Sequence, residues 1–236
     1  MEMVFDLKGK VARKVAKFQE MKKQRGVTLL EIIIVLGIIG IIAAGVVILA
    51  QRAFTAQDLS DIQNNANSIR TSMAEAFKDD PQYPASAEIK GLTKSTIASS
   101  TVAAPIVTLV KLGKISPDEA FNGMSGDAFQ IGNAKVDTNA SANKGFVLVV
   151  NGLSTEDCRN LISQMGNQWD YVEALNSGAG AGKSVASIDG KNLAATTATA
   201  PVLKTMATGD ISSSAIVGTN VCSGAGEING VIFGSK

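Results

Sequence analysis

The chain has 236 residues, a formal net charge of +1 at pH 7 and no histidine. Without histidine the commonest general base and the commonest metal ligand are missing, so we expect no catalytic residue, no metal and no cofactor. A near-neutral chain that lacks a basic stripe also disfavours nucleic acid as a partner.

The first 26 residues form a basic leader. They contain eight Lys or Arg and three acidic residues, a net charge of +5. The rest of the chain contains fourteen basic and eighteen acidic residues, a net charge of −4. This asymmetry indicates that the two parts reside in different places.

A long apolar stretch follows the leader. From Ile32 to Ala50 there are nineteen residues without a charge. At about 1.5 Å per residue they nearly span a bilayer core of about 30 Å. We expect a membrane-spanning helix, with the leader in the cytoplasm by the positive-inside rule and everything after Gln51 in the periplasm or beyond. A cleaved signal peptide ending at the small residues 43–45 and a permanent signal anchor are open alternatives.

Neither alternative explains Glu31. A carboxylate within an apolar helix costs about 2.5 to 3.5 kcal/mol on insertion scales, so this residue is a functional candidate. It ends the motif Gly-Val-Thr-Leu-Leu-Glu at 26–31, directly after the basic leader. The motif resembles the processing site of type IV prepilins, and the run from Thr28 to Gly40 is similar to the type IVb pilins of enteric pathogens. A carboxylate that only snorkels to the membrane surface is the competing interpretation.

The resemblance implies a processing step and three segments. A prepilin peptidase would cut between Gly26 and Val27 and methylate the new amine of Val27. Residues 1–26 would be the cleaved leader, 27–50 the transmembrane and filament-core helix, and 51–236 the globular pilin head. The long leader and a residue other than Phe after the cut both fit the type IVb branch.

Cleavage would also give Glu31 a partner. The new ammonium of Val27 lies only four residues from the carboxylate, and opposite charges in a dry helix bundle attract strongly enough to offset part of their desolvation. In a filament, the Val27 amine of one subunit could pair with Glu31 of its neighbour. Glu31 is therefore the predicted assembly residue, and the pairing would set the axial register.

The helical pattern continues beyond the apolar stretch. Apolar residues recur at spacings of three and four, which predicts one stripe on an amphipathic helix. They are Leu59, Ile62, Ala66, Ile69, Met73 and Ala76. We expect one helix from about Leu29 to about Lys78 that stops before Pro81, because proline disfavours helix in the residue before it. A coiled coil is the competing account of the stripe.

The second half of the chain predicts short elements. Ser116 to Glu119 has the capping-box pattern and starts a short helix at best. Residues 146–150 predict a buried strand that Asn151-Gly152 ends, and 231–233 predict a final strand. Residues 176–200 are poor in large apolar side chains and predict an exposed loop or edge, with disorder as an alternative.

Ser154 predicts the cap of another helix, in which Cys158, Leu161, Ile162 and Met165 share a face. Cys158 and Cys222 are the two cysteines of the chain and have no C-x-x-C spacing. A single disulfide between them is expected if the head is exported, and its loop of about 65 residues corresponds to roughly 4 kcal/mol. Two unrelated buried thiols are the alternative.

The predicted fold class is α+β, with a sheet laid on the second half of the long helix. The resemblance specifies the type IV pilin fold: the apolar half of the helix protrudes, the amphipathic half packs on an antiparallel sheet, and a disulfide closes the C-terminal region.

The leading functional hypothesis is the major structural subunit of a type IVb pilus for adhesion, aggregation or colonisation. The resemblance implies a homo-polymer built through N-terminal helices, and as partners the prepilin peptidase, an assembly ATPase, a platform protein and a secretin. It places the precursor in the inner membrane and the product in an extracellular pilus. A minor pilin or a type II secretion pseudopilin is the alternative. A membrane-anchored hydrolase is disfavoured, since the chain offers neither histidine nor G-x-S-x-G.

Overall fold

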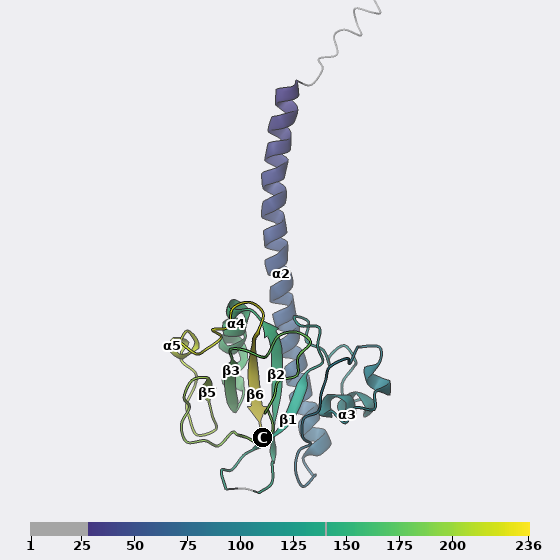
Figure 1. The fold of residues 1–236 in the computed structure, drawn as a ribbon, viewed down its shortest axis with the longest axis vertical. Coiled ribbons are helices and arrows are strands. Elements are labelled where there is room, and N and C mark those ends of the chain that lie inside the picture. Colours follow the sequence, from purple (N-terminus) through teal and green to yellow (C-terminus); the bar gives the residue numbers. More distant parts are fainter. Residues whose placement is uncertain (1–27, 140) are drawn as a thin grey trace, which may run out of the picture. The chain divides into compact units, whose positions relative to one another are not determined.

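The computed structural model describes residues 28–139 and 141–236 (Figure 1). The chain divides into two compact units, one ending at Ala53 and one from Phe54 to Lys236. We call residues 54–236 the head.

The first element, α2, is a single helix from Leu29 to Phe77. Its bounds confirm the predicted helix to within one residue at its end. In the head half of α2 the predicted stripe is buried from Leu59 to Met73, and Ala76 is partly buried against the same core. The stripe therefore serves the packing of the head, as an amphipathic helix on a globular domain requires.

The head contains one six-stranded sheet with the strand order β4-β1-β2-β6-β3-β5. The strands are β1 (Gln130–Lys135), β2 (Gly145–Leu153), β3 (Tyr171–Leu175), β4 (Lys191–Asn192), β5 (Val202–Lys204) and β6 (Asn229–Ser235). The C-terminal strand β6 lies between β2 and β3 and pairs with both in antiparallel register.

The sheet is mixed, which corrects the expectation of an antiparallel one. Four of the five strand pairs are antiparallel, but β4 runs parallel to β1. This strand has only two residues and follows a long loop. The loop gives the chain enough length to return to the edge of the sheet in the same direction as β1, which a short hairpin cannot do.

β2 contains the predicted strand 146–150 but does not end at Asn151-Gly152. The pairing with β6 shifts between Val150 and Leu153, and the strand continues to Leu153. Gly152 has φ +72°, and a Cβ there would lie 2.7 Å from the Cβ of Ser125. The Asn-Gly pair therefore forms an irregularity inside the strand rather than a turn after it.

The remaining helical elements are short. They are η1 (Ile97–Ser99), α3 (Pro105–Lys111), α4 (Thr155–Met165), η2 (Gly166–Gln168) and α5 (Ser213–Ile216). α4 begins after Ser154, whose side chain accepts a hydrogen bond from the backbone N–H of Asp157, as predicted. The four apolar residues predicted to share a face of α4 are all buried.

The capping pattern at Ser116–Glu119 forms its reciprocal bonds without a helix. The Ser116 N–H donates to Glu119 Oε2 at 2.8 Å, and the Glu119 N–H donates to Ser116 Oγ at 3.3 Å. The segment that follows is a turn. Four residues are too few for a helix, because the first turn loses conformational entropy that only further hydrogen bonds can offset.

The sheet separates two hydrophobic clusters. Along β2, Phe146 and Leu148 belong to the larger core, which also contains the buried stripe of α2 and the buried face of α4. Val147 and Val149 belong to a second cluster on the opposite side, as the alternation of side chains along a strand dictates. Both faces of β2 are therefore covered.

Residues 176–200 supply the cover of the second cluster. The segment is irregular and contains the edge strand β4, in agreement with the prediction of a loop or edge. Ile188 and Leu193 are nevertheless buried to within 1% exposure. Most other residues of this segment are small, so its average composition does not reveal that two of its side chains belong to a core.

Candidate functional site

The start of α2 carries the residues predicted to be functional. Thr28 accepts a hydrogen bond from the backbone N–H of Glu31 through Oγ1 at 3.2 Å, and its carbonyl accepts one from the N–H of Ile32 at 3.2 Å. Thr28 therefore caps the helix, and Glu31 lies in its first turn, where a negative charge is favourable to the helix dipole. Gly26 and Val27 lie outside the described residues.

The first half of α2 is apolar on every side. Its fifteen large hydrophobic side chains between Leu29 and Leu49 are between 46% and 79% exposed. The helix is long and apolar enough to cross a membrane, with a mean hydropathy of 3.3 over its most apolar window. A Cβ added at Gly37, Gly40 or Gly45 would meet nothing within 4 Å. This half of the helix therefore has an apolar surface that no other part of residues 28–139 and 141–236 covers.

Cys158 and Cys222 form a disulfide that joins α4 to the loop before β6. The Cα atoms lie 5.9 Å apart, the two residues are 64 positions apart in sequence, and both are fully buried. The disulfide-closed C-terminal region expected of the fold is thus present, and the alternative of two unrelated thiols is wrong.

Asn229 holds the same loop from inside. Its side-chain amide donates to the carbonyls of Leu153, Gly224 and Gly226, and its Oδ1 accepts from the N–H of Gly224 at 2.8 Å. Asn229 is fully buried. The last loop is therefore fixed both covalently and by a satisfied polar network.

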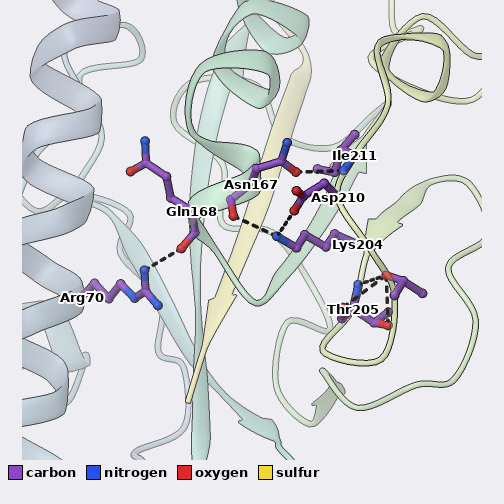
Figure 2. Close-up of polar contacts among 8 residues, drawn as sticks. Arg70, Asn167, Gln168, Lys204, Thr205, Asp210 and Ile211 are labelled. Atoms are coloured by element: carbon purple, nitrogen blue, oxygen red, sulfur yellow. Dashed lines mark hydrogen bonds and ion pairs between the residues drawn. The ribbon is translucent and has the colours of Figure 1, made fainter.

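Two cations hold the C-terminal end of α4 and the turn η2 that continues it (Figure 2). Arg70 of α2 donates to the Gln168 carbonyl at 2.7 Å, and Lys204 of β5 donates to the Asn167 carbonyl at 2.8 Å. The last carbonyls of a helix lack partners within it and carry partial negative charge, so cations are favourable there. The end of α4 is thereby tied to α2 on one side and to β5 on the other.

Each cation also has further contacts. The Arg70 Nε donates to Ser235 Oγ at 2.9 Å, and the guanidinium lies 5.1 Å from the centre of the Trp169 ring. Lys204 lies 3.4 Å from Asp210, and the Ile211 N–H donates to the Asn167 side chain at 2.8 Å. Figure 2 shows Arg70 on one side of Gln168, and Lys204, Asp210 and Ile211 on the other side of the turn, beside Asn167.

An ion pair lies on the side of the sheet that carries the second hydrophobic cluster. Lys191 Nζ lies 2.7 Å from Glu173 Oε2, and the Tyr171 hydroxyl donates to the same carboxylate at 2.8 Å. Burial, with a smaller contribution from the negative charge of Glu173, raises the pKa of Tyr171 far above its ordinary value. Tyr171 is therefore a neutral hydrogen-bond donor to Glu173 within β3, and the ion pair of Glu173 with Lys191 joins β3 to β4.

The contacts described above join structural elements to one another and do not form a catalytic site. Within residues 28–139 and 141–236 no three His, Cys, Asp or Glu side chains gather as a metal site. The roles of Thr28, Arg70, Lys204 and Asn229 were not predicted from the sequence. Thr28 had a readable signal, since Thr28-x-x-Glu31 has the same capping spacing as Ser116-x-x-Glu119. The other three act through long-range contacts that no local pattern reveals.

The chain is similar to known pilins. The family profile described as toxin-coregulated pilus subunit TcpA matches residues 108–230, and the prokaryotic N-terminal methylation motif matches residues 21–47. The toxin coregulated pilin of Vibrio cholerae is 38% identical over 175 residues, 73% of either chain. That of Vibrio cholerae serotype O1, strain ATCC 39315 / El Tor Inaba N16961, is 38% identical over 168 residues, 70% of either chain.

A solved structure shares the fold. The crystal structure of TcpA, a type IV pilin from the El Tor biotype of Vibrio cholerae, superposes with a TM-score of 0.56 at 24% identity, covering 76% of this chain and 99% of that chain. By sequence and by fold, this chain belongs to the toxin-coregulated pilus subunit TcpA family of type IV pilins.

Proposed function

We propose that the chain is the major structural subunit of a type IVb pilus, made as a membrane precursor and polymerised into an extracellular filament. The observation that carries the proposal is the methylation motif at residues 21–47, which includes the cap of α2 and most of the exposed apolar half of that helix. The family is one of structural pilins, so the chain is not an enzyme. Adhesion, aggregation or colonisation would follow from the polymer.

The processing step is the first test. Cleavage between Gly26 and Val27 would remove the basic leader and leave the apolar helix in the product. Mass spectrometry of protein from sheared filaments should find a chain that begins at Val27 and carries one added methyl group. Gly26→Val should leave full-length precursor in the membrane, because a branched side chain then stands at the cleaved bond. An intact leader in wild-type filaments would contradict the proposal.

The orientation follows from charge. The leader has a net charge of +5, which would keep it in the cytoplasm while the head, closed by a disulfide, lies in the periplasm. A maleimide probe that cannot cross the inner membrane tests this on intact spheroplasts. In the uncleaved Gly26→Val precursor, a cysteine introduced at the exposed head residue Lys183 should react, and one introduced at Lys8 in the leader should not. Assembly would need an ATPase, a platform protein and a secretin as partners.

Glu31 is the proposed assembly residue. Its carboxylate would pair with the Val27 ammonium of a neighbouring copy in the dry filament core, where an unpaired charge is costly. Glu31 also interacts favourably with the helix dipole, so insertion and cleavage are measured beside filament yield to separate the two roles. Glu31→Gln keeps the shape and removes the charge; we expect normal insertion and cleavage with few filaments. Glu88→Gln, at an exposed head position, is the matched control. Wild-type filament yield from Glu31→Gln would refute the pairing.

A further inference from the structure

A groove of about 690 Å³ lies in the head where the C-terminal part of α2 passes the ends of β2 and β6. It is lined by Asn67, Arg70, Thr71, Ala74, Glu75, Lys78, Tyr83, Lys144, Ser235 and Lys236. Asn67, Thr71 and Glu75 of α2, and Lys78 directly after it, are exposed on the side of the helix away from the buried stripe, and Arg70 and Ala74 are half-buried. The groove therefore opens on the solvent face of the helix.

The lining carries excess positive charge. Glu75 is paired with Lys114 at 3.0 Å, and Arg70 lies 3.8 Å from Asp170. The three lysines that remain, Lys78, Lys144 and Lys236, have no carboxylate within ion-pair distance among the described residues. Lys144 donates only to the backbone carbonyl of Asp80.

This charge stands out against the head as a whole. Residues 54–236 contain thirteen basic and seventeen acidic residues, a net charge of −4. Heads of the same negative charge repel one another when they are brought together. A positive groove on such a surface offers a place where a negative part of another head can dock.

Two carboxylates that could complement the positive charge of the groove lie on the same helix, α2. Asp58 and Asp61 are three residues apart and so lie on one side of α2. Asp61 is exposed and accepts one hydrogen bond, from Gln57 at 2.9 Å, and Asp58 is half-buried beside Gly123. Asp61 precedes Lys78 by seventeen residues, which is about 26 Å along a helix. The two groups cannot meet within one chain.

We propose that the groove around Lys78 binds the carboxylates of Asp58 and Asp61 from a second copy of the chain, displaced along the helix axis. The inference rests on the proposed function, because it requires copies aligned through their helices. The contact joins different surfaces of the two copies. It therefore repeats from copy to copy without closing, as a filament needs. It also opposes the repulsion between negative heads.

A zero-length cross-linker tests the contact on the unaltered protein. A carbodiimide joins a carboxylate to an amine only where the two touch. In sheared filaments it should produce a peptide in which Lys78 is bonded to Asp61 or Asp58, and this must arise between copies because of the separation along α2. The same chain dispersed in detergent should not yield it. Filaments in which Lys78 joins only other carboxylates, or none, would overturn the proposal.

Charge exchange is the second test. Lys78→Glu and Asp61→Lys should each lower filament yield by at least about tenfold, since each puts like charges in contact. The two changes in one chain should restore most of the yield, because the exchanged pair at positions 78 and 61 again joins opposite charges. Lys183→Glu, an exposed lysine outside the groove, should leave the yield unchanged.

The outcomes separate the two proposals. Absence of filaments from the wild-type chain would reject the pilus subunit itself. Wild-type filaments with normal yield from both single variants, or a double variant no better than either single one, would reject only the docking contact. Formation of the Cys158–Cys222 disulfide in each variant verifies that its head has folded, and the cross-link needs no variant at all.

Discussion

The two halves of α2 are both rich in apolar residues, yet they relate to their surroundings in opposite ways. Between Leu29 and Leu49 all fifteen large apolar side chains are exposed, whereas the head half contains a buried stripe that includes Ile62 and Ile69 at 0% exposure. In the head half, the apolar stripe packs against the sheet of the same chain. No described residue covers the first half in this way, which fits burial in a bilayer or against other copies of the chain.

The difference explains the two sequence patterns. A helix packed on one side needs one apolar stripe and keeps polar residues elsewhere, while a helix surrounded by lipid or by other helices is apolar all round. Burial of a Leu or Ile side chain contributes about 1.5 to 3 kcal/mol. Burial of the exposed apolar side chains of α2, by membrane insertion or by assembly, would therefore be strongly favourable. Stability of the head and stability of the filament are therefore separable properties.

The disulfide offers the largest test of that separation. Replacement of both Cys158 and Cys222 by serine should lower the free energy of unfolding of the head by about 4 kcal/mol, since the bond closes a loop of 64 residues. Urea unfolding of the full chain in detergent micelles can be followed by the fluorescence of Trp169, the only tryptophan. The helical circular dichroism of the apolar half should persist after the head unfolds. Simultaneous loss of both signals would contradict the separation.

A matched pair of isoleucines gives the next effect. Ile69→Ala should destabilise the head by about 3 kcal/mol, because the side chain is fully buried and leaves a cavity. Ile41→Ala makes the same chemical change at a side chain that is 76% exposed, and should leave the unfolding of the head unchanged. Filament yield should respond to Ile41→Ala instead. Equal shifts of the urea midpoint for the two variants would show that the halves are not independent.

The sequence predicted the elements whose signals are local. The bounds of α2, the Ser154 cap and the buried face of α4 follow from periodicity and capping residues, and the structure agrees with each. The sheet edges were not predictable in this way. β4 and β5 have two and three residues, and their positions depend on pairing with strands far away in sequence.

The contacts of the head surface were hidden for a similar reason. Arg70 resembles any polar residue on the solvent side of α2, and its contacts with Gln168 and Ser235 span 98 and 165 positions. The processing and assembly residues were readable because their family motif is short and continuous. Gly26, Val27 and Glu31 keep their roles as predictions that the proposed experiments test.

Two arginines of α2 provide a smaller contrast. Arg70→Ala should cost the head about 1 to 3 kcal/mol, because the change removes charged hydrogen bonds to Gln168 and Ser235. Arg52→Ala removes an exposed arginine from the other half of the helix and should leave the unfolding of the head unchanged. Since Arg70 lies against Trp169, circular dichroism is the appropriate probe. An unaffected urea midpoint for Arg70→Ala would mean that water replaces its contacts at no cost.

The smallest expected effect on stability concerns Glu119. Like Glu31, it lies three residues after a capping hydroxyl, but it belongs to the head. Hydrogen bonds from the backbone N–H and the hydroxyl of Ser116, with a further one from Ser68 of α2, lower the pKa of Glu119 below its ordinary value of 4.5. A lowered pKa in the folded state means that the ionised form stabilises the fold above the ordinary value, and that this contribution is lost as the pH falls through the folded pKa. Glu119 is partly exposed, so the contribution is at most about 1 kcal/mol. Glu119→Gln should therefore lower the urea midpoint slightly at pH 7, and the difference from wild type should shrink at low pH. An equal difference at both pH values would assign the effect to side-chain geometry rather than to charge.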